Sequence, residues 1–329
     1  MASATPRRAL VTGATGLLGR EITSTFRDSG WYVKGTAYAR ADGIDIAKLD
    51  LQSEDTTKLE TLLDEISCTQ RPDVIIHSAA QRFPDKVDKD PGAAQSLNIA
   101  ASRRLAQAAL SRNILLIYIS TDYVFPGIPG EAPYEADAEP RPTNLYGQTK
   151  LDGERAVLQV ASTLDRPGLA VVLRVPVLYG HAETPAESAV NVLLESVWKA
   201  QTEGTRIQMD HWALRYPTNT KDVGRVCRAI SIKYLEAFAN KAQHLLPSIL
   251  QFSSEDKMTK YEICQLLGKI MGLETTSIVA NTEGNDPNAS VQRPFDCHLS
   301  TSALKNLAID ISTCDFVEWW RRELGAFVK

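Results

Sequence analysis

The chain has 329 residues, of which 43% are hydrophobic and 23% are charged, and its formal net charge at pH 7 is -4. This composition is typical of a folded globular protein and excludes a disordered or fibrous chain. The mild acidity gives no electrostatic reason to expect nucleic acid or an anionic membrane surface as a partner. No apolar run approaches the roughly 18 residues that a membrane helix requires.

The first half of the chain alternates short apolar runs with amphipathic stretches. We expect strands at 8–12, 32–38, 74–77, 115–120 and 169–174. We expect helices at 17–28, 59–66, 93–110, 145–159 and 222–230. Apolar strands separated by helices predict a parallel sheet that is covered on both faces, which is a Rossmann-type, doubly wound α/β fold.

The alternating pattern ends after residue 174, where prolines interrupt irregular segments. We expect residues 6–174 and 217–245 to form a Rossmann domain that binds NADP. Residues 175–216 and 246–329 should form a smaller lobe that faces a substrate or a partner, with helices at 259–271 and 315–327. The five cysteines form no C-x-x-C pair and the N-terminal apolar run is too short for a secretion signal, so we expect a reducing, cytoplasmic location.

A glycine-rich turn follows the first strand and opens the first helix. Gly13, Gly16 and Gly19 are spaced as G-x-x-G-x-x-G. In this strand–turn–helix context, such glycines allow a tight turn, the approach of a pyrophosphate, and close packing of helix on strand. The pattern predicts a dinucleotide site.

The end of the second strand indicates which dinucleotide is bound. An acidic residue there would hold the ribose hydroxyls of NAD(H), but the segment has none and carries Arg40. A guanidinium suits a 2′-phosphate, so we expect NADP(H). Residues 49–51 are expected to end a further strand, which follows the second one, and Asp50 at that end could meet the adenine. The small residues Ser78, Ala79 and Ala80 leave room for the cofactor, whereas His77 is expected to pack within its strand.

A Y-x-x-x-K pair, Tyr146 and Lys150, lies at the start of an expected helix. Residues i and i+4 share a helix face, so the phenol and the ammonium should enter one cleft, where the ammonium would lower the phenol pKa. Thr121, at the end of the preceding strand, could donate a hydrogen bond to a substrate carbonyl. Motifs for a serine hydrolase, a zinc protease or a P-loop are missing, and the dispersed histidines predict no metal site.

At these positions the chain resembles the extended short-chain dehydrogenase/reductases of the dTDP-4-dehydrorhamnose reductase branch. The resemblance rests on residues 12–19 (TGATGLLG), 120–125 (STDYVF) and 146–154 (YGQTKLDGE). Within the branch the chain is most similar to the regulatory beta subunits of methionine adenosyltransferase, through residues 209–212 (MDHW) and 258–262 (MTKYE) among others.

The resemblance implies an NADP-binding protein that associates with the catalytic subunit and modulates S-adenosylmethionine synthesis. It implies an acid–base role for Tyr146, assisted by Lys150 and Thr121. In addition to Gly13, Gly19, Ala79 and Ala80, which were predicted above, it implies cofactor contacts at Thr15, Gly16, Leu17, Leu18, Tyr38, Arg40, Asp50, Leu51, Ser78, Arg82, Tyr146, Lys150 and Leu178. The family's subunit contacts its partner through a C-terminal tail, and here we expect that tail to be shorter or different.

Two functions remain open from the sequence. In the first, the protein is a regulatory subunit; in the second, it is an NADPH-dependent reductase of a 4-keto-6-deoxy sugar nucleotide. A sugar-nucleotide epimerase or dehydratase would use the same residues and ranks third. A sugar-nucleotide site needs cationic or aromatic groups, for which Trp212, Arg215 and Arg293 are the candidates.

Overall fold

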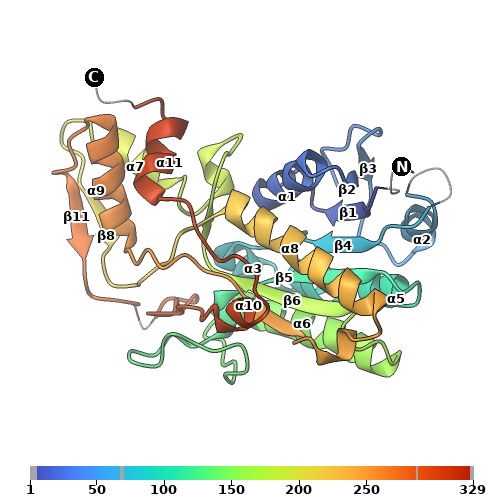
Figure 1. The fold of residues 1–329 in the computed structure, drawn as a ribbon. Coiled ribbons are helices and arrows are strands. Elements are labelled where there is room, and N and C mark those ends of the chain that lie inside the picture. Colours follow the sequence, from blue (N-terminus) through green and yellow to red (C-terminus); the bar gives the residue numbers. More distant parts are fainter. Residues whose placement is uncertain (1–5, 67–69, 287, 327–329) are drawn as a thin grey trace.

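A computed structural model describes residues 6–66, 70–286 and 288–326 (Figure 1). Its centre is a seven-stranded sheet with the order β10-β6-β5-β4-β1-β2-β3, in which every neighbouring pair is parallel. The strands are β1 (Arg8–Thr12), β2 (Tyr32–Ala37), β3 (Ile46–Lys48), β4 (Val74–His77), β5 (Leu115–Thr121), β6 (Ala170–Val175) and β10 (Ile249–Gln251). The strand order reverses between β1 and β4, as the predicted doubly wound fold requires.

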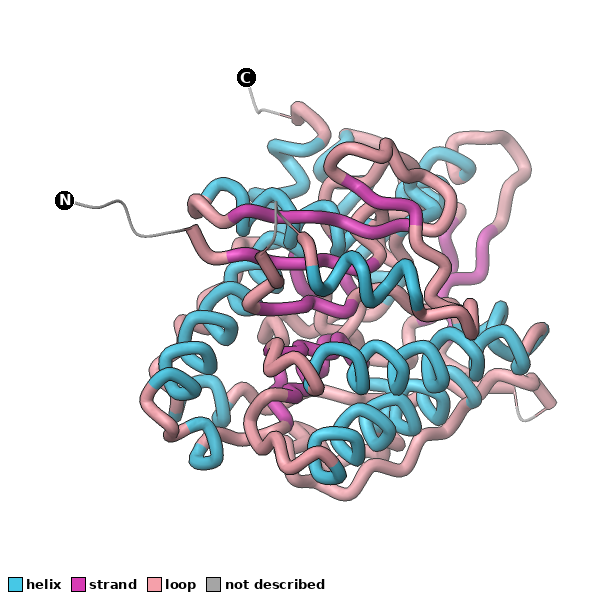
Figure 2. Tube along the Cα trace, turned by 90° about the vertical axis from the view of Figure 1, so that its right-hand side faces the viewer, coloured by secondary structure: helices cyan, strands magenta, loops and turns pink. Residues whose placement is uncertain are grey.

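Helices cover both faces of this sheet, as Figure 2 shows from the side. On one face α1 (Leu17–Asp28) packs along α8 (Thr220–Ala239). On the other face α5 (Ser102–Leu110) packs against α2 (Thr57–Asp64) and α6 (Leu145–Thr163). The apolar strands lie in one large core between these layers, which explains why their sequences do not alternate.

The helix expected at 93–110 has a more varied backbone than its sequence suggests. It consists of α4 (Pro91–Gln95), a π-helical segment (Ser96–Ala101) and α5. The short helix α3 (Pro84–Lys89) precedes it and packs on α6. The π-helical segment carries Asn98, whose side chain bonds to the backbone of Gln81 and to Thr149, so this segment ties α6 to the loop that follows β4.

A second, smaller core lies beyond the carboxyl ends of the strands. It is built from α7 (Leu193–Lys199), α9 (Lys260–Met271), α11 (Phe316–Glu323) and the paired strands β8 (Ile207–Asp210) and β11 (Ile278–Asn281). Trp320 is fully buried in this core, against Tyr179 and Trp319. The remaining elements are β7 (Leu178–Tyr179), β9 (Thr218–Asn219), α10 (Ser302–Asn306) and 3-10 turns at Asp122–Val124, Pro185–Glu187 and Gln243–Leu245.

Two sequence expectations need correction. Residues 249–251 were expected in the smaller lobe, but they form strand β10 at the edge of the main sheet, and α10 packs on them. This strand was too short for its pattern to be recognised. The last helix ends at Glu323 rather than continuing to 327, and residue 327 lies outside the described residues. Within the described parts of the chain, no helix has the length and apolar character needed to span a membrane.

Candidate functional site

One cleft of about 580 Å³ follows the carboxyl ends of the parallel strands and extends to the smaller lobe. Every residue predicted to contact the cofactor lines this cleft, from Gly13, the first of them in the sequence, to Leu178, the last. Thr121, Tyr146 and Lys150 line it as well, together with Arg215 and Arg293 from the smaller lobe. The crevice at the carboxyl edge of such a sheet is where open α/β folds bind ligands.

The glycine turn adopts the predicted geometry. Gly13 has a φ of 66°, in the left-handed region that favours glycine. A Cβ atom on Gly19 would lie 2.1 Å from the Gly13 carbonyl oxygen, so only glycine lets α1 begin this close to the turn. The helix starts at Leu17 with no side chain capping it, and its first N–H groups face the cleft as a site for a phosphate.

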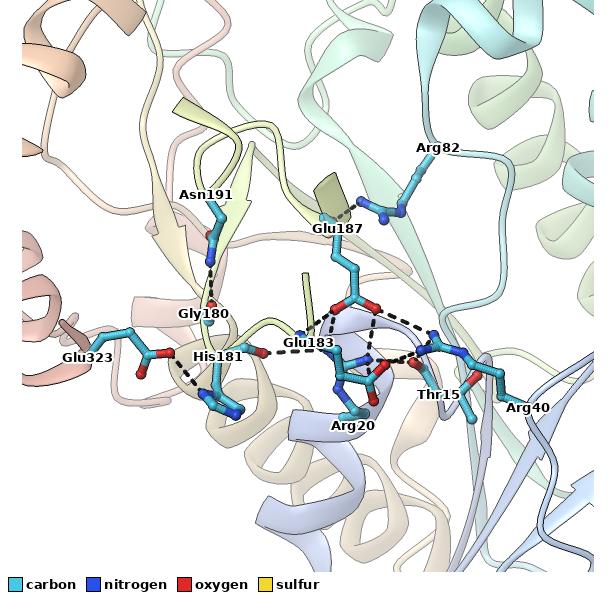
Figure 3. Close-up of polar contacts among 10 residues, drawn as sticks. All are labelled: Thr15, Arg20, Arg40, Arg82, Gly180, His181, Glu183, Glu187, Asn191 and Glu323. Atoms are coloured by element: carbon cyan, nitrogen blue, oxygen red, sulfur yellow. Dashed lines mark hydrogen bonds and ion pairs between the residues drawn. The ribbon is translucent and has the colours of Figure 1, made fainter. Parts of the chain in front are cut away.

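Arg40 lies beside this turn and is engaged with acidic residues from a distant segment (Figure 3). Its guanidinium pairs with Glu183, lies 3.5 Å from the Glu187 carboxylate and donates to the carbonyl of Thr15. Arg20, from α1, donates to the same Glu187 carboxylate at 3.1 Å. Sequence reasoning missed Arg20, because its role becomes visible only when residues 20, 40 and 187 are brought together.

We call residues 181–188 the crossing segment, because they connect the smaller lobe to three arginines of the sheet domain (Figure 3). The third arginine, Arg82, follows β4 and donates to the backbone carbonyl of Glu187. At the other end of the segment, His181 Nδ1 lies 2.8 Å from Glu323 Oε1 on α11. The Arg20 guanidinium holds the pKa of Glu187 below its usual range, so this carboxylate is ionised at neutral pH.

Tyr146 is positioned by the start of α6. The Asn144 side chain caps that helix by accepting a hydrogen bond from the Gly147 N–H at 2.9 Å. A Cβ atom on Gly147 would lie 2.1 Å from the Tyr123 carbonyl oxygen, so glycine allows α6 to press against the turn that follows β5. The rings of Tyr123 and Tyr146 then meet edge to face, with centroids 5.9 Å apart.

Lys150 does not act on Tyr146 as we expected. Its Nζ donates to the Ile119 carbonyl oxygen at 2.8 Å and lies 4.0 Å from the centroid of the Tyr118 ring. Burial lowers the pKa of Lys150 to about 7, so it carries only part of its charge at neutral pH. Burial also raises the pKa of Tyr146 above its ordinary value, and a hydrogen bond with Thr121 offsets this only in part. The phenol is therefore protonated at neutral pH.

Thr121 and Asp122 form a small polar pair at the end of β5. The Thr121 hydroxyl donates to Asp122 Oδ1 at 2.9 Å and accepts from the Tyr123 N–H at 3.2 Å. Burial raises the pKa of Asp122 to about 6, although the nearby Arg215 opposes this shift. The acceptor of the Thr121 proton is thus a buried carboxylate in the same cleft.

Two buried polar clusters within the sheet domain support the site. Arg174 pairs with Glu154 at 2.8 Å, and each side chain is only 2% exposed. His77 is buried and bonds to Thr12 at 2.7 Å and to Ser102 at 3.0 Å, which confirms its predicted role as a packed strand residue. Burial lowers the pKa of His77 to about 3, so the ring is neutral.

Trp212 is the one candidate that the structure places away from the cleft. Its ring packs against Phe295, with centroids 5.1 Å apart, and beneath Gly284. The cleft wall contains residues that the sequence did not single out: Phe83, Pro84, Asp85, Val190, Lys260 and Ile263. Among the described residues, no three His, Cys, Asp or Glu side chains lie close enough to hold a metal ion.

The fold and the Tyr146–Lys150 cleft define a protein of the extended short-chain dehydrogenase/reductase class. Residues 7–329 match the family model described as RmlD substrate binding domain, and the chain belongs to this family. The chain is also 40% identical to methionine adenosyltransferase 2 subunit beta of Xenopus tropicalis over 304 residues, which are 92% of this chain and 83% of that protein. The subunit beta of Rattus norvegicus is 40% identical over 306 residues, with the same coverage of both chains.

Reductases of the same family are more distant. A dTDP-4-dehydrorhamnose reductase of Streptomyces griseus is 38% identical over 173 residues, which are 53% of this chain and 50% of that protein. The solved structure of dTDP-4-dehydrorhamnose reductase from Bacillus anthracis in complex with NADP has a TM-score of 0.74 and 21% identity, and the match covers 98% of this chain and 99% of that one. Because its identity is below 25%, this structure supports the fold alone.

Proposed function

We propose that this protein binds NADP(H) in the cleft and acts as a regulatory, beta-type subunit of methionine adenosyltransferase in the cytoplasm. The observation that carries the regulatory part is the 40% identity to such beta subunits, which extends over both lobes. The partner would be the catalytic subunit of methionine adenosyltransferase, and the outcome would be altered S-adenosylmethionine synthesis.

The cleft suits a dinucleotide with a 2′-phosphate. The N-terminus of α1 would hold the pyrophosphate, and Arg40 and Arg20 lie beside it as cations for a further phosphate. The second strand ends without a carboxylate that would favour NAD(H). Lys150 and Tyr146 would hold the nicotinamide ribose at the other end of the cleft.

The alternative is an NADPH-dependent reductase of a 4-keto-6-deoxy sugar nucleotide. The observation that favours it is the close grouping of Thr121, Tyr146 and Lys150 in one cleft. Bound NADPH would supply a hydride to the substrate carbonyl. Tyr146 would then donate its phenolic proton to the new alkoxide as the general acid.

The two functions are separated by one experiment. The purified, NADP-loaded protein is mixed with the catalytic subunit of methionine adenosyltransferase, and the complex is measured by size-exclusion chromatography and the synthetase rate with and without the protein. We expect a stoichiometric complex with altered synthetase kinetics. A Gly16→Val variant, whose new methyl groups would block the pyrophosphate, shows whether the cofactor is required for assembly.

The absence of a complex would contradict the regulatory proposal. Oxidation of NADPH with dTDP-4-dehydrorhamnose would then establish the reductase alternative. Oxidation of NADPH with this substrate, together with a complex that alters the synthetase rate, would show that the reductase and the regulatory activity reside in one chain.

A further inference from the structure

The crossing segment is held in place mainly by polar contacts. Of the described residues 181–188, only Ser188 is buried. Its hydroxyl donates to the Leu178 carbonyl at 2.7 Å and accepts from the Asn191 N–H at 3.0 Å. The Asn191 side chain in turn donates to the Gly180 carbonyl at 2.9 Å, so the two ends of the loop are tied together (Figure 3). A surface loop with fixed ends and few buried contacts can open locally at low free-energy cost.

Two carboxylates hold the exposed part of the segment. Glu187 Oε1 lies 3.1 Å from Arg20 Nη1, and Glu183 pairs with Arg40. The Glu183 N–H also donates to the Glu187 carboxylate at 3.1 Å, so the two glutamates are joined within the segment. The segment can therefore leave the two arginines as one unit, with its internal bonds intact.

The two arginines are attached to the glycine turn independently of the segment. Both donate to the Thr15 carbonyl, Arg20 at 2.6 Å. Here two guanidinium groups face two carboxylates, whereas a phosphate monoester adds a charge of about −1.5 to −2 at neutral pH. Its arrival beside Arg20 and Arg40 would leave an excess of negative charge, and the glutamates are the groups free to move away, because they lie on the loosely held loop.

The other end of the segment contacts the last helix of the smaller lobe. His181 Nδ1 lies 2.8 Å from Oε1 of Glu323, the last residue of α11 (Figure 3). Just before the segment, the Tyr179 ring meets Trp319 of α11 edge to face, with centroids 5.1 Å apart. Displacement of the segment would withdraw His181 from the end of α11, while the aromatic contact would keep the helix attached.

We propose that the crossing segment is a strap that the 2′-phosphate of NADP(H) displaces from Arg20 and Arg40, and that this displacement releases the last turn of α11. NAD(H), which lacks that phosphate, would occupy the cleft with the strap in place. The inference rests on the proposed cofactor and adds regulation to its site. The surface of the smaller lobe at α11 would then differ between the NADP(H)-bound protein and the NAD(H)-bound or cofactor-free protein.

The test is amide hydrogen exchange, followed by mass spectrometry, in residues 181–188 and 316–323. The protein is measured without cofactor, saturated with NADP+ and saturated with NAD+, and a fluorescence titration of the same samples establishes binding. We expect NADP+ to accelerate exchange in both segments by roughly twofold to fivefold, the range that corresponds to the loss of partly exposed ion pairs. NAD+ should leave both segments at the cofactor-free rate.

Glu187→Gln tests the hold on the strap. Without this charge the cofactor-free variant should already exchange in residues 181–188 about as fast as the NADP+-saturated wild type. Glu195→Gln, at an exposed position on α7, is the matched control and should exchange as the wild type does.

His181→Ala tests the connection to α11. Residues 181–188 should still respond to NADP+ in this variant, but residues 316–323 should respond no longer. His244→Ala, at an exposed position in the turn Gln243–Leu245, should behave as the wild type.

The possible failures are distinguishable. Binding of NADP+ without faster exchange, or equal acceleration by bound NAD+, would overturn the strap and leave the cofactor proposal standing. A response of residues 316–323 that persists in His181→Ala would overturn the connection to α11. Failure of NADP+ to bind the wild type would overturn the proposed cofactor and the strap together.

Discussion

Arg20 on α1 and Glu187 in the crossing segment form a two-point ion pair between the sheet domain and the smaller lobe (Figure 3). The same carboxylate lies 3.5 Å from Arg40. The guanidinium groups suited to a cofactor phosphate are therefore already neutralised by an acidic group of the chain itself. A 2′-phosphate must compete with that carboxylate for the same donors.

Glu187→Gln should raise the affinity for NADPH. The substitution keeps the size of the side chain and removes the charge that competes with the 2′-phosphate for Arg20 and Arg40. Because partly exposed ion pairs are worth about 0.5–1 kcal/mol, we expect a gain of about twofold to fivefold. Fluorescence titration with NADPH and with NADH measures it, and NADH, which lacks the phosphate, should gain less. Glu318→Gln, on the exposed surface of α11, is the control; equal gains for both cofactors would contradict the competition.

Arg40→Asp should move the preference from NADP(H) towards NAD(H). The new carboxylate would repel a 2′-phosphate and could accept hydrogen bonds from ribose hydroxyls. We expect the ratio of NADPH to NADH affinity to fall by about tenfold or more, which corresponds to about 1.4 kcal/mol. Arg103→Asp, on the exposed face of α5, is the matched control. An unchanged ratio would remove Arg40 from cofactor selection.

Tyr146→Phe should separate cofactor binding from proton transfer. The phenyl ring can keep its edge-to-face contact with Tyr123, so we expect NADPH affinity to fall by less than about tenfold, the worth of one hydrogen bond. Any reductase activity should fall by about 10²-fold or more, because the proton donor is lost. Complex formation with methionine adenosyltransferase should not change. A reductase rate equal to that of the wild type would show that another group donates the proton.

Lys150→Met should change how stability depends on pH. Burial places the Lys150 pKa at about 7, against an ordinary value of 10.5, so between these values the unfolded chain binds more protons than the folded one. The contribution of Lys150 to the free energy of unfolding therefore rises with pH across that window. Its destabilising effect is largest below pH 7, where the buried amine is charged. We expect the cofactor-free variant to be more stable than the wild type by about 2–4 kcal/mol at pH 6, with the difference shrinking towards pH 10.

Urea unfolding at pH 6, 8 and 9.5 measures this difference. Lys269→Met, at an exposed position on α9, should show no such pH dependence. A constant difference between Lys150→Met and the wild type would mean that the ammonium is not desolvated in the folded chain.

The sequence predicted the parts of the site that depend on local patterns. Each of these patterns spans only a few residues of the sequence: the glycine turn, each apolar strand, and the pair Tyr146 and Lys150. The structure places all of them as expected. Strand β10 was missed because its three residues are too few to show a pattern. The state of Lys150 could not be predicted, since it depends on the depth of burial and on the Ile119 carbonyl.

The substrate end of the cleft was predicted least well. Trp212 was chosen for its aromatic ring, but the ring is covered by the smaller lobe's own loop. Lys260 was overlooked because a lysine at the start of a helix is ordinary on a surface, and only the tertiary fold encloses it near Arg215 and Arg293. Contacts between segments more than a hundred residues apart, such as Arg20 with Glu187, leave no local pattern.

The ion pairs Arg20–Glu187 and Arg293–Asp85 join the two lobes along the cleft that they share. Separation of the lobes would break both pairs, and dissolved salt would screen mainly the more exposed Arg293–Asp85 pair. Ionic strength should therefore set how long a dinucleotide stays bound, because residence time depends on how often the lobes part. In a cell, a change in salt or in competing polyanions would then alter the rate of cofactor exchange before it altered the amount bound.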